Sequence, residues 1–358
     1  MISSILVKPA GPDCNLRCSY CFYRQKTGIF GGKTHRMSDK TLDILLRDAI
    51  QSGITTFSWQ GGEPTMMGLD FYKSVVEKQM KYGSAPMANA LQTNGVLLDG
   101  KWTRFLAEHG FLVGLSLDGP RRLHDHYRKD ARGKGTFDRV MASASLLREH
   151  GVDFNVLTLL NNINVAQPDV IYDFLLDNDV YFMQFVPCVE PGPASFSISA
   201  EQYGEFLVRI FDRWAEDFPC VSIRDFDDLL MRELGRGPGT CTVRGRCGSY
   251  FVVEHNGDVF ACDFFVVSRW RLGNITQTPL TELAKSEKFE QFAEAKSKLG
   301  DECANCRFVR WCYGGCQKHR TALGGKSTGP SYFCEAYKRL FEHALPRMPE
   351  LVTRLGEC

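Results

Sequence analysis

The first half of the chain alternates short apolar, β-branched runs with longer stretches whose apolar residues recur at helical spacing. The apolar runs predict strands near residues 3–10, 54–60, 88–94, 111–117, 152–160 and 180–187. The stretches between them predict helices near residues 39–52, 69–82, 99–109, 136–150 and 167–179. Ser38 is placed as the N-cap of the first of these helices. Repeated strand and helix imply a parallel sheet.

Six such strand-helix units are too few for a closed eight-stranded barrel, so they predict a partial (β/α)6 TIM-type barrel of the α/β class. The active site of such a barrel lies at the carboxyl ends of its strands. Residues suited to binding and catalysis follow several of the predicted strands, among them Cys14, Gln60, Gly62 and Ser116. We therefore expect these residues to face one mouth of the barrel.

Beyond Pro187 the alternation ends, and a turn-rich segment leads into two predicted helices over residues 200–234. Alternating apolar residues around an Asn256-Gly257 turn predict a hairpin over residues 249–265. The expected domains are a barrel over residues 1–190, a helical linker over 191–240, a small cysteine-rich α+β domain over 241–340 and a C-terminal tail over 341–358.

Composition narrows the class of protein. The 358 residues are 44% hydrophobic, which is enough to bury a large core. Lys and Arg total 43 against 42 Asp and Glu, and this net charge of +1 leaves no excess to hold nucleic acid or an anionic membrane. The first residues lack the long apolar core and cleavage site of a secretory signal, and no stretch is apolar enough to span a membrane. We expect a cytoplasmic protein.

Cysteine is the unusual feature, with 14 residues in the chain. Without a secretory signal, close-spaced cysteines more often bind metal or carry redox chemistry than form disulfides. Cys14, Cys18 and Cys21 follow a predicted strand, and three thiols are one fewer than a zinc site normally uses. A 4Fe–4S cluster held by three thiolates keeps one iron open for a ligand. The alternative is three small buried hydrophobes, which the polar flanking residues Asp13 and Asn15 argue against.

Eight more cysteines form a second ladder near the C-terminus. They are Cys241, Cys247, Cys262, Cys303, Cys306, Cys312, Cys316 and Cys334. Eight ligands make two sites of four. Spacing alone leaves two structural zinc sites as an alternative to two iron-sulfur clusters, since four-cysteine zinc sites with CxxC pairs are common. Zinc cannot accept an electron, so an oxidative reaction at the first site would favour clusters.

The first cysteine group, with Tyr20 before its last member, resembles the signature of the radical S-adenosylmethionine enzymes. In that superfamily the cofactor chelates the open iron through its methionine amine and carboxylate. A reduced cluster then splits the cofactor to give a 5′-deoxyadenosyl radical. The resemblance extends to the Gly61-Gly62-Glu63-Pro64 segment, whose glycines would let the backbone approach the cofactor. By itself that segment is more typical of an ordinary glycine turn, and its place after the second predicted strand favours cofactor binding.

The whole chain resembles the anaerobic sulfatase-maturating enzymes, whose barrel is followed by a twin-cluster SPASM domain. Beyond the cysteines, the resemblance rests on LVKPAGPDCNLRCSYCFY, WQGGEPT, LQTNG, FLVGLSLDGP, YRKD, VSIRDFD, FVVEHNGDVFACDFF and RWRLGNI. The family's interleaved pattern implies a first auxiliary cluster on Cys241, Cys247, Cys262 and Cys316. It implies a second on Cys303, Cys306, Cys312 and Cys334, and therefore three 4Fe–4S clusters in all.

The same resemblance implies contacts with S-adenosylmethionine at Tyr20, Gly62, Ser116, Arg128 and Val189. Val189 departs from the aliphatic residue that the family often has. Tyr23 and Gln60 are candidates to touch the substrate, with ordinary packing at a strand end as the alternative.

Asp263 matches the acidic residue that the family uses as a base. The alternative for Asp263 is a hairpin-end aspartate bonded to the backbone. Cys188, Cys220 and Cys358 receive no chemical role.

The resemblance implies oxidation of a Cys or Ser side chain in a sulfatase to Cα-formylglycine. The substrate would be an unfolded sulfatase polypeptide, and electrons would come from a donor such as flavodoxin or ferredoxin. Two rival functions stay open. One is another SPASM-type radical enzyme that closes a thioether crosslink in a peptide. The other is a non-catalytic electron-transfer or zinc-binding protein, which would not consume S-adenosylmethionine.

Overall fold

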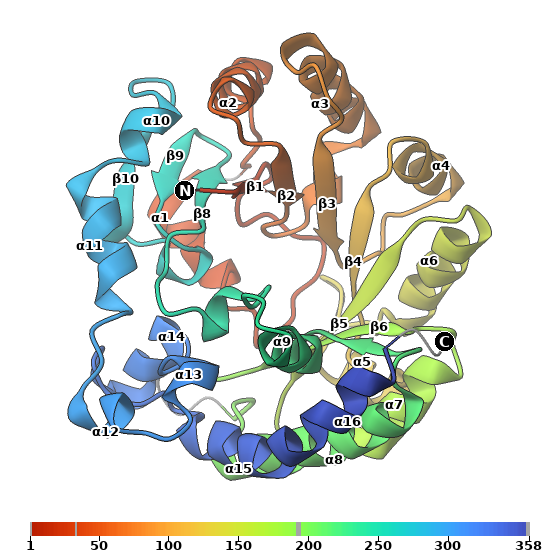
Figure 1. Ribbon diagram of the computed structural model, residues 1–358. Coiled ribbons are helices and arrows are strands. Elements are labelled where there is room, and N and C mark those ends of the chain that lie inside the picture. The colour runs from red at the N-terminus through yellow and green to blue at the C-terminus, as the bar shows by residue number, and fades with distance from the viewer. Residues whose placement is uncertain (1, 33, 191–194, 356–358) are drawn as a thin grey trace. The chain divides into compact units, whose positions relative to one another are not determined.

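The computed structural model describes residues 2–32, 34–190 and 195–355 (Figure 1). Cys358 lies outside these residues. The chain forms two compact units, each assembled from separate stretches of sequence. The first contains Met1–Ser116, Asp125–Phe154 and Gly248–Phe292. The second contains Leu117–His124, Asn155–Cys247 and Ala293–Cys358.

The first unit is built on parallel strands that follow the predicted order. They are β1 (Ser4–Lys8), β2 (Thr56–Trp59), β3 (Ala88–Thr93) and β4 (Leu112–Ser116). Each strand pairs with the next, and the register places Val7 opposite Trp59. Parallel pairing puts the carboxyl ends of all these strands at one edge of the sheet. The segments that begin at Cys14, Gln60 and Asn94 therefore leave from that edge.

Helices cover one side of this sheet, as Figure 1 shows for the labelled elements. They are α2 (Asp39–Gln51), α3 (Leu69–Tyr82), α4 (Gly100–Glu108) and α6 (Phe137–Glu149). Alternate strand residues such as Ile5, Phe57 and Leu91 are fully buried, because a strand sends successive side chains to opposite faces. The predicted cap of α2 is confirmed, since Ser38 Oγ accepts a hydrogen bond from Thr41 N–H at 3.1 Å.

A hairpin from late in the sequence extends the sheet of the first unit. Strands β8 (Tyr250–Glu254) and β9 (Asp258–Phe260) pair antiparallel around the predicted Asn256-Gly257 turn. Strand β8 also pairs in parallel with β1, and β10 (Arg271–Asn274) joins β9. The hairpin is confirmed, but its pairing with β1 was not predicted. It places residues 262–263 in the same unit as the first cysteine loop.

The second unit has its own strands, β5 (Phe154–Leu160), β6 (Phe182–Pro187) and β7 (Ser222–Ile223), which are parallel. Longer helices are α7 (Pro168–Leu176), α8 (Ala200–Asp217), α9 (Arg224–Glu233) and α15 (Cys334–Ala344). Short helices are α12 (Asp301–Ala304), α13 (Val309–Cys312), α14 (Gln317–Thr321) and α16 (Met348–Thr353). Helix α8 packs against α7 and α15. Much of the predicted tail is thus helical.

Several short elements had no sequence signal. They are α1 (Thr27–Phe30), α5 (Arg121–Tyr127), β7, β10, α10 (Leu280–Leu283) and α11 (Glu287–Ala295). Each of them spans only two to nine residues and carries few repeats of a hydrophobic pattern. Within the described residues, no helix has the length and apolar character needed to cross a membrane.

Candidate active site and metal centres

The loop after β1 carries the first three cysteines. Cys14 Sγ accepts hydrogen bonds from Leu16 N–H at 3.4 Å and from the Asn94 amide at 3.7 Å. Although Cys14 reaches the surface, the pKa of its thiol is raised to about 12, mainly by desolvation and also by the nearby Glu63, Cys18 and Cys21. Cys18 and Cys21 are thus near enough to influence the Cys14 thiol, which is compatible with one shared centre.

The glycine segment after β2 holds this loop by its backbone. Gly62 N–H donates to Gly11 O at 2.8 Å, and Glu63 N–H donates to Asp13 O at 2.8 Å. A Cβ atom on residue 62 would lie 2.0 Å from Asp13 O. Only glycine allows such a close approach at this point. Asp13, which directly precedes Cys14, is thus held by the Gly61-Gly62-Glu63-Pro64 segment, which was predicted to bind the cofactor.

Glu63 anchors the same segment from inside. Its carboxylate is fully buried and accepts hydrogen bonds from Thr65, Thr93 Oγ1 and Asn94 N–H. Burial raises the pKa of Glu63, while these hydrogen bonds lower it. The carboxylate connects the ends of β2 and β3, and Asn94 continues the connection to Cys14. Glu63 had no predicted role of its own.

The residues predicted to contact the cofactor lie in both units. Tyr20 is buried, and the Arg128 guanidinium carbon lies 5.8 Å from the centre of its ring. Ser116 ends β4, and its hydroxyl accepts a hydrogen bond from Gln92 Nε2 at 3.1 Å. The first unit therefore brings Tyr20 and Arg128 together and orients Ser116 at the expected edge. Val189 is fully buried and belongs to the second unit.

Asp263 lies just beyond the β8–β9 hairpin. Within the described residues its carboxylate bonds to side chains and not to the backbone, unlike a hairpin-end aspartate that caps its own turn. One carboxylate oxygen forms an ion pair with Lys8 Nζ, and the other accepts a hydrogen bond from Gln60 Nε2 at 3.4 Å. The Lys8 side chain is 1% exposed and that of Asp263 is 15% exposed. The Asp263 carboxylate is thus oriented by two side chains, and its side chain is still partly exposed.

Lys8 also contacts Tyr23. Its ammonium nitrogen lies 3.4 Å from the centre of the Tyr23 ring, which is cation–π geometry. The Tyr23 hydroxyl donates to the buried Glu254 carboxylate, whose oxygens lie 2.6 and 2.7 Å away. Burial raises the pKa of Tyr23 well above its usual range, and Glu254 raises it further. Tyr23 is 2% exposed, and it contacts Lys8 through its ring and Glu254 of strand β8 through its hydroxyl.

Of the other ladder cysteines, Cys241, Cys247 and Cys316 belong to the second unit. Burial raises the pKa of Cys241, with Cys316 the next contributor, and burial also raises the pKa of Cys247 to about 11. Cys316 thus interacts with Cys241 and Cys247. Cys262 lies in the first unit, with its sulfur 3.5 Å from the Tyr250 hydroxyl.

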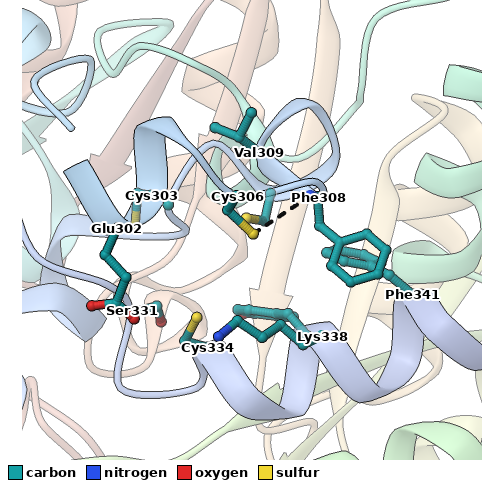
Figure 2. Close-up of a pocket in the computed structure, with 12 residues that line it drawn as sticks. Glu302, Cys303, Cys306, Phe308, Val309, Ser331, Cys334, Lys338 and Phe341 are labelled. Carbon is teal, nitrogen blue, oxygen red and sulfur yellow. Dashed lines mark hydrogen bonds between the residues drawn. The ribbon is translucent and has the colours of Figure 1, made fainter. Parts of the chain in front are cut away.

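The remaining four cysteines surround one pocket of the second unit. Figure 2 shows the labelled side chains of Cys303, Cys306 and Cys334 turned toward it, and Cys312 also lines it. Burial raises the pKa of Cys334 to about 12. Four thiols around one pocket could supply the four thiolates of an iron-sulfur cluster.

Sequence reasoning missed the residues that support these groups. For Lys8 a signal was present in the sequence. This lysine directly follows the strand run SILV, and a lysine buried at the end of a strand almost always has a partner. Glu254 gives the same signal, since it is a charged residue at the end of the apolar strand β8. Lys296 and Arg320 gave none, since neither lies in a strongly patterned segment.

Parts of this chain match two known domain families. Residues 9–175 match the Radical SAM superfamily, and residues 241–307 match the iron-sulfur cluster-binding domain called SPASM. A cysteine-type anaerobic sulfatase-maturating enzyme of Clostridium perfringens is 38% identical over 96% of this chain and 97% of its own length. A serine-type enzyme of Bacteroides thetaiotaomicron is also 38% identical, over 96% of this chain and 90% of its own.

Solved structures give the same result. The structure described as native anSMEcpe with bound AdoMet matches with a TM-score of 0.92 and 37% sequence identity, over 98% of this chain and all of the other. The same protein with bound AdoMet and the Cp18Cys peptide matches equally well. This likeness confirms the predicted fold class, a partial barrel of the α/β type with a SPASM domain. The chain belongs to the anaerobic sulfatase-maturating enzymes of the radical S-adenosylmethionine superfamily.

Proposed function

We propose that this protein oxidises a Cys or Ser side chain of a sulfatase polypeptide to Cα-formylglycine without oxygen. The observation that carries the proposal is the Asp263 carboxylate, held by Lys8 and Gln60 in the same unit as the three-thiol loop. A base and a radical-generating site are two of the groups that this oxidation needs, beside an acceptor for the second electron. Both 38% identical relatives are named for the maturation of sulfatases.

The donor sets fit the cofactors that the family uses. Cys14, Cys18 and Cys21 would hold a 4Fe–4S cluster with one open iron. The ladder cysteines would hold two more, on Cys241, Cys247, Cys262 and Cys316, and on Cys303, Cys306, Cys312 and Cys334. Tyr20, Gly62, Ser116, Arg128 and Val189 would contact S-adenosylmethionine. When bound, these groups supply the adenosyl radical that removes a hydrogen atom and accept the second electron.

The protein's own contribution is to move and hold a proton. Asp263 accepts the thiol or hydroxyl proton of the target side chain at a carboxylate oxygen. Lys8 and Gln60 fix the orientation of that carboxylate, so the accepting oxygen is positioned before the substrate arrives. A positioned base is usually worth about 10²–10⁴-fold in rate.

The substrate is a polypeptide that has not yet folded. A residue that becomes part of a folded hydrolase active site is buried, and an enzyme-bound radical could not reach it there. A relative was solved with the Cp18Cys peptide bound, which supports recognition of short segments. Gln60 is the best candidate for a direct substrate contact, since it already bonds Asp263. A one-electron donor such as flavodoxin or ferredoxin would supply the reducing electrons.

The test uses anaerobically reconstituted protein with S-adenosylmethionine, a chemical reductant and a peptide containing Cys-x-Pro-x-Arg, followed by mass spectrometry. Oxidation of Cys removes two hydrogens to give a thioaldehyde, and water then replaces its sulfur by oxygen and releases hydrogen sulfide, whereas oxidation of Ser only removes two hydrogens. A thioether crosslink would remove two hydrogens from the Cys peptide and keep the sulfur. The matched control is the same peptide with Ala at the target position, which should stay unchanged.

A second arm compares the peptide with a folded, unmodified sulfatase. The unfolded form should be oxidised much faster. Equal turnover of the folded sulfatase would contradict the proposed substrate state. A Cys peptide that loses hydrogens but keeps its sulfur would contradict formylglycine formation and support the crosslinking function.

A further inference from the structure

Two cations in the second unit are buried where a charge is costly. Lys296 follows α11, and Arg320 lies on α14; each residue is 1% exposed. Transfer of an unpaired charge into a protein interior costs several kcal/mol or more, so buried cations are normally paired with carboxylates. No carboxylate in the described part of the chain pairs with either residue, and both cations donate to carbonyl oxygens instead.

The hydrogen bonds of Arg320 tie it to the segment between two cysteines. Its guanidinium donates to Gly314 O at 2.9 Å and to Tyr313 O at 2.6 Å. It also donates to the carbonyls of Lys296 and Ser327, at 2.8 and 3.2 Å. Residues 313–315 connect Cys312, which borders the pocket of Figure 2, to Cys316 of the other group. Arg320 thus lies beside the link between two groups of thiols.

Lys296 is tied to only one of these groups. Its ammonium donates to Cys241 O at 2.5 Å and to Thr242 O at 2.9 Å. Both acceptors lie at the first cysteine of the ladder, so the contacts of this ammonium place it beside the group of Cys241.

For Arg320 the opposing thiols come from both groups. Burial lowers the pKa of Arg320, while Cys303, Cys247, Cys312 and Cys316 raise it. Neutral thiols and carbonyls do not compensate a full positive charge. Thiolates bound to an iron-sulfur cluster would compensate it, because such a cluster carries net negative charge.

We infer that Arg320 is the shared counter-charge of both auxiliary centres and that Lys296 serves only the centre of Cys241, Cys247 and Cys316. This inference rests on the clusters in the proposed function. The added electron of a reduced centre is stabilised by a nearby positive charge. Loss of that charge therefore makes the reduction potential more negative. The two cations would make both centres easier to reduce and so better acceptors for the electron that the oxidation releases.

The experiment is an anaerobic redox titration of the holoenzyme, followed by electron paramagnetic resonance of the reduced clusters. It uses a background in which the first cluster is removed by changing Cys14, Cys18 and Cys21 to Ala. Arg320→Met should shift the potentials of both remaining centres to more negative values. Lys296→Met should shift only one of them. Arg320→Lys keeps the positive charge, so the potentials of both centres should stay close to the parent values.

Arg307→Met is the matched control, since Arg307 lies in the same cysteine-rich segment but is 70% exposed and paired with Glu342. Solvent screens such a charge, so both potentials should stay at the parent values. If Arg320→Met lost iron, the reduction potentials of Lys296→Met and Arg320→Lys would still test the counter-charge roles.

The inference is overturned if both Met variants retain about eight irons per chain, as two four-thiolate clusters contain, and show unshifted potentials. Equal shifts of both centres by Lys296→Met would also overturn the assignment. A parent protein without any reducible auxiliary centre would instead contradict the proposed function, so the two failures are distinguishable.

Discussion

The Gly62→Ala substitution should disrupt the first cysteine loop while leaving the rest of the molecule intact. The added Cβ would lie 2.0 Å from Asp13 O, and real Cβ atoms essentially never come within 3.0 Å of an atom outside their own residue and its chain neighbours. The two backbones must therefore separate by about 1 Å, since 3.0 minus 2.0 is 1.0. A displacement of this size breaks the hydrogen bonds from Gly62 to Gly11 and from Glu63 to Asp13, both 2.8 Å long.

The cost follows from these contacts. Two lost backbone hydrogen bonds contribute about 2 kcal/mol, at ~1 kcal/mol each. Overpacking contributes a further ~1–3 kcal/mol. The residue that moves directly precedes Cys14, so the loop should lose affinity for its cluster. We expect the variant to lose about four of about twelve irons per chain. Cleavage of S-adenosylmethionine to 5′-deoxyadenosine should fall on the order of 10²-fold or more, as misplacement by about 1 Å can cause.

The assay measures iron content and 5′-deoxyadenosine formation under anaerobic conditions. Gly28→Ala is the control, because no atom lies within 4 Å of a Cβ built on this helical glycine of the same unit. It should keep the parent iron content and rate. Full iron content together with the parent cleavage rate in Gly62→Ala would refute the close approach as the reason for glycine at this position.

Three further substitutions separate the roles of the remaining groups. Asp263→Asn should keep its iron and lower the yield of oxidised peptide by roughly 10²–10⁴-fold, the usual effect of losing a positioned base, while cofactor cleavage falls less. Formation of the peptide product at the parent rate would exclude Asp263 as the base. Lys8→Met should lower product on the order of 10–10²-fold because the carboxylate loses its orientation, and Lys8→Arg should restore part of this; equal loss in Arg and Met variants would argue against an ion-pair role. Changing Cys14, Cys18 and Cys21 together to Ala should leave about eight irons by metal analysis and abolish cofactor cleavage; zinc in place of this iron in protein purified without oxygen would contradict the auxiliary clusters.

Much of the local structure could be predicted from the sequence because it depends on neighbouring residues. The Ser38 cap and the Asn256-Gly257 turn are of this kind, and the structure has both. The cysteine loop could be recognised because its ligands are close together in the sequence. Spacing also indicated two four-cysteine sites, although only the family resemblance supplied the interleaved ligand sets.

What could not be predicted depends on contacts between distant segments. Lys8 and Asp263 are 255 positions apart, and they meet because β8 pairs with β1. Nothing local in either strand encodes that pairing. Arg320 is similar, since its four carbonyl partners come from three separate segments of chain. Such networks become visible only once the tertiary structure is known.

The most direct test of the central claim follows the hydrogen that leaves the substrate. A Cys-x-Pro-x-Arg peptide carrying deuterium on Cβ of the target cysteine is incubated anaerobically with the reconstituted protein, reductant and S-adenosylmethionine, and both products are measured by mass spectrometry. We predict that deuterium appears in 5′-deoxyadenosine and that the same peptide carries an aldehyde in place of its thiol. Deuterium-free 5′-deoxyadenosine formed alongside aldehyde, or labelled 5′-deoxyadenosine without aldehyde, would contradict the account.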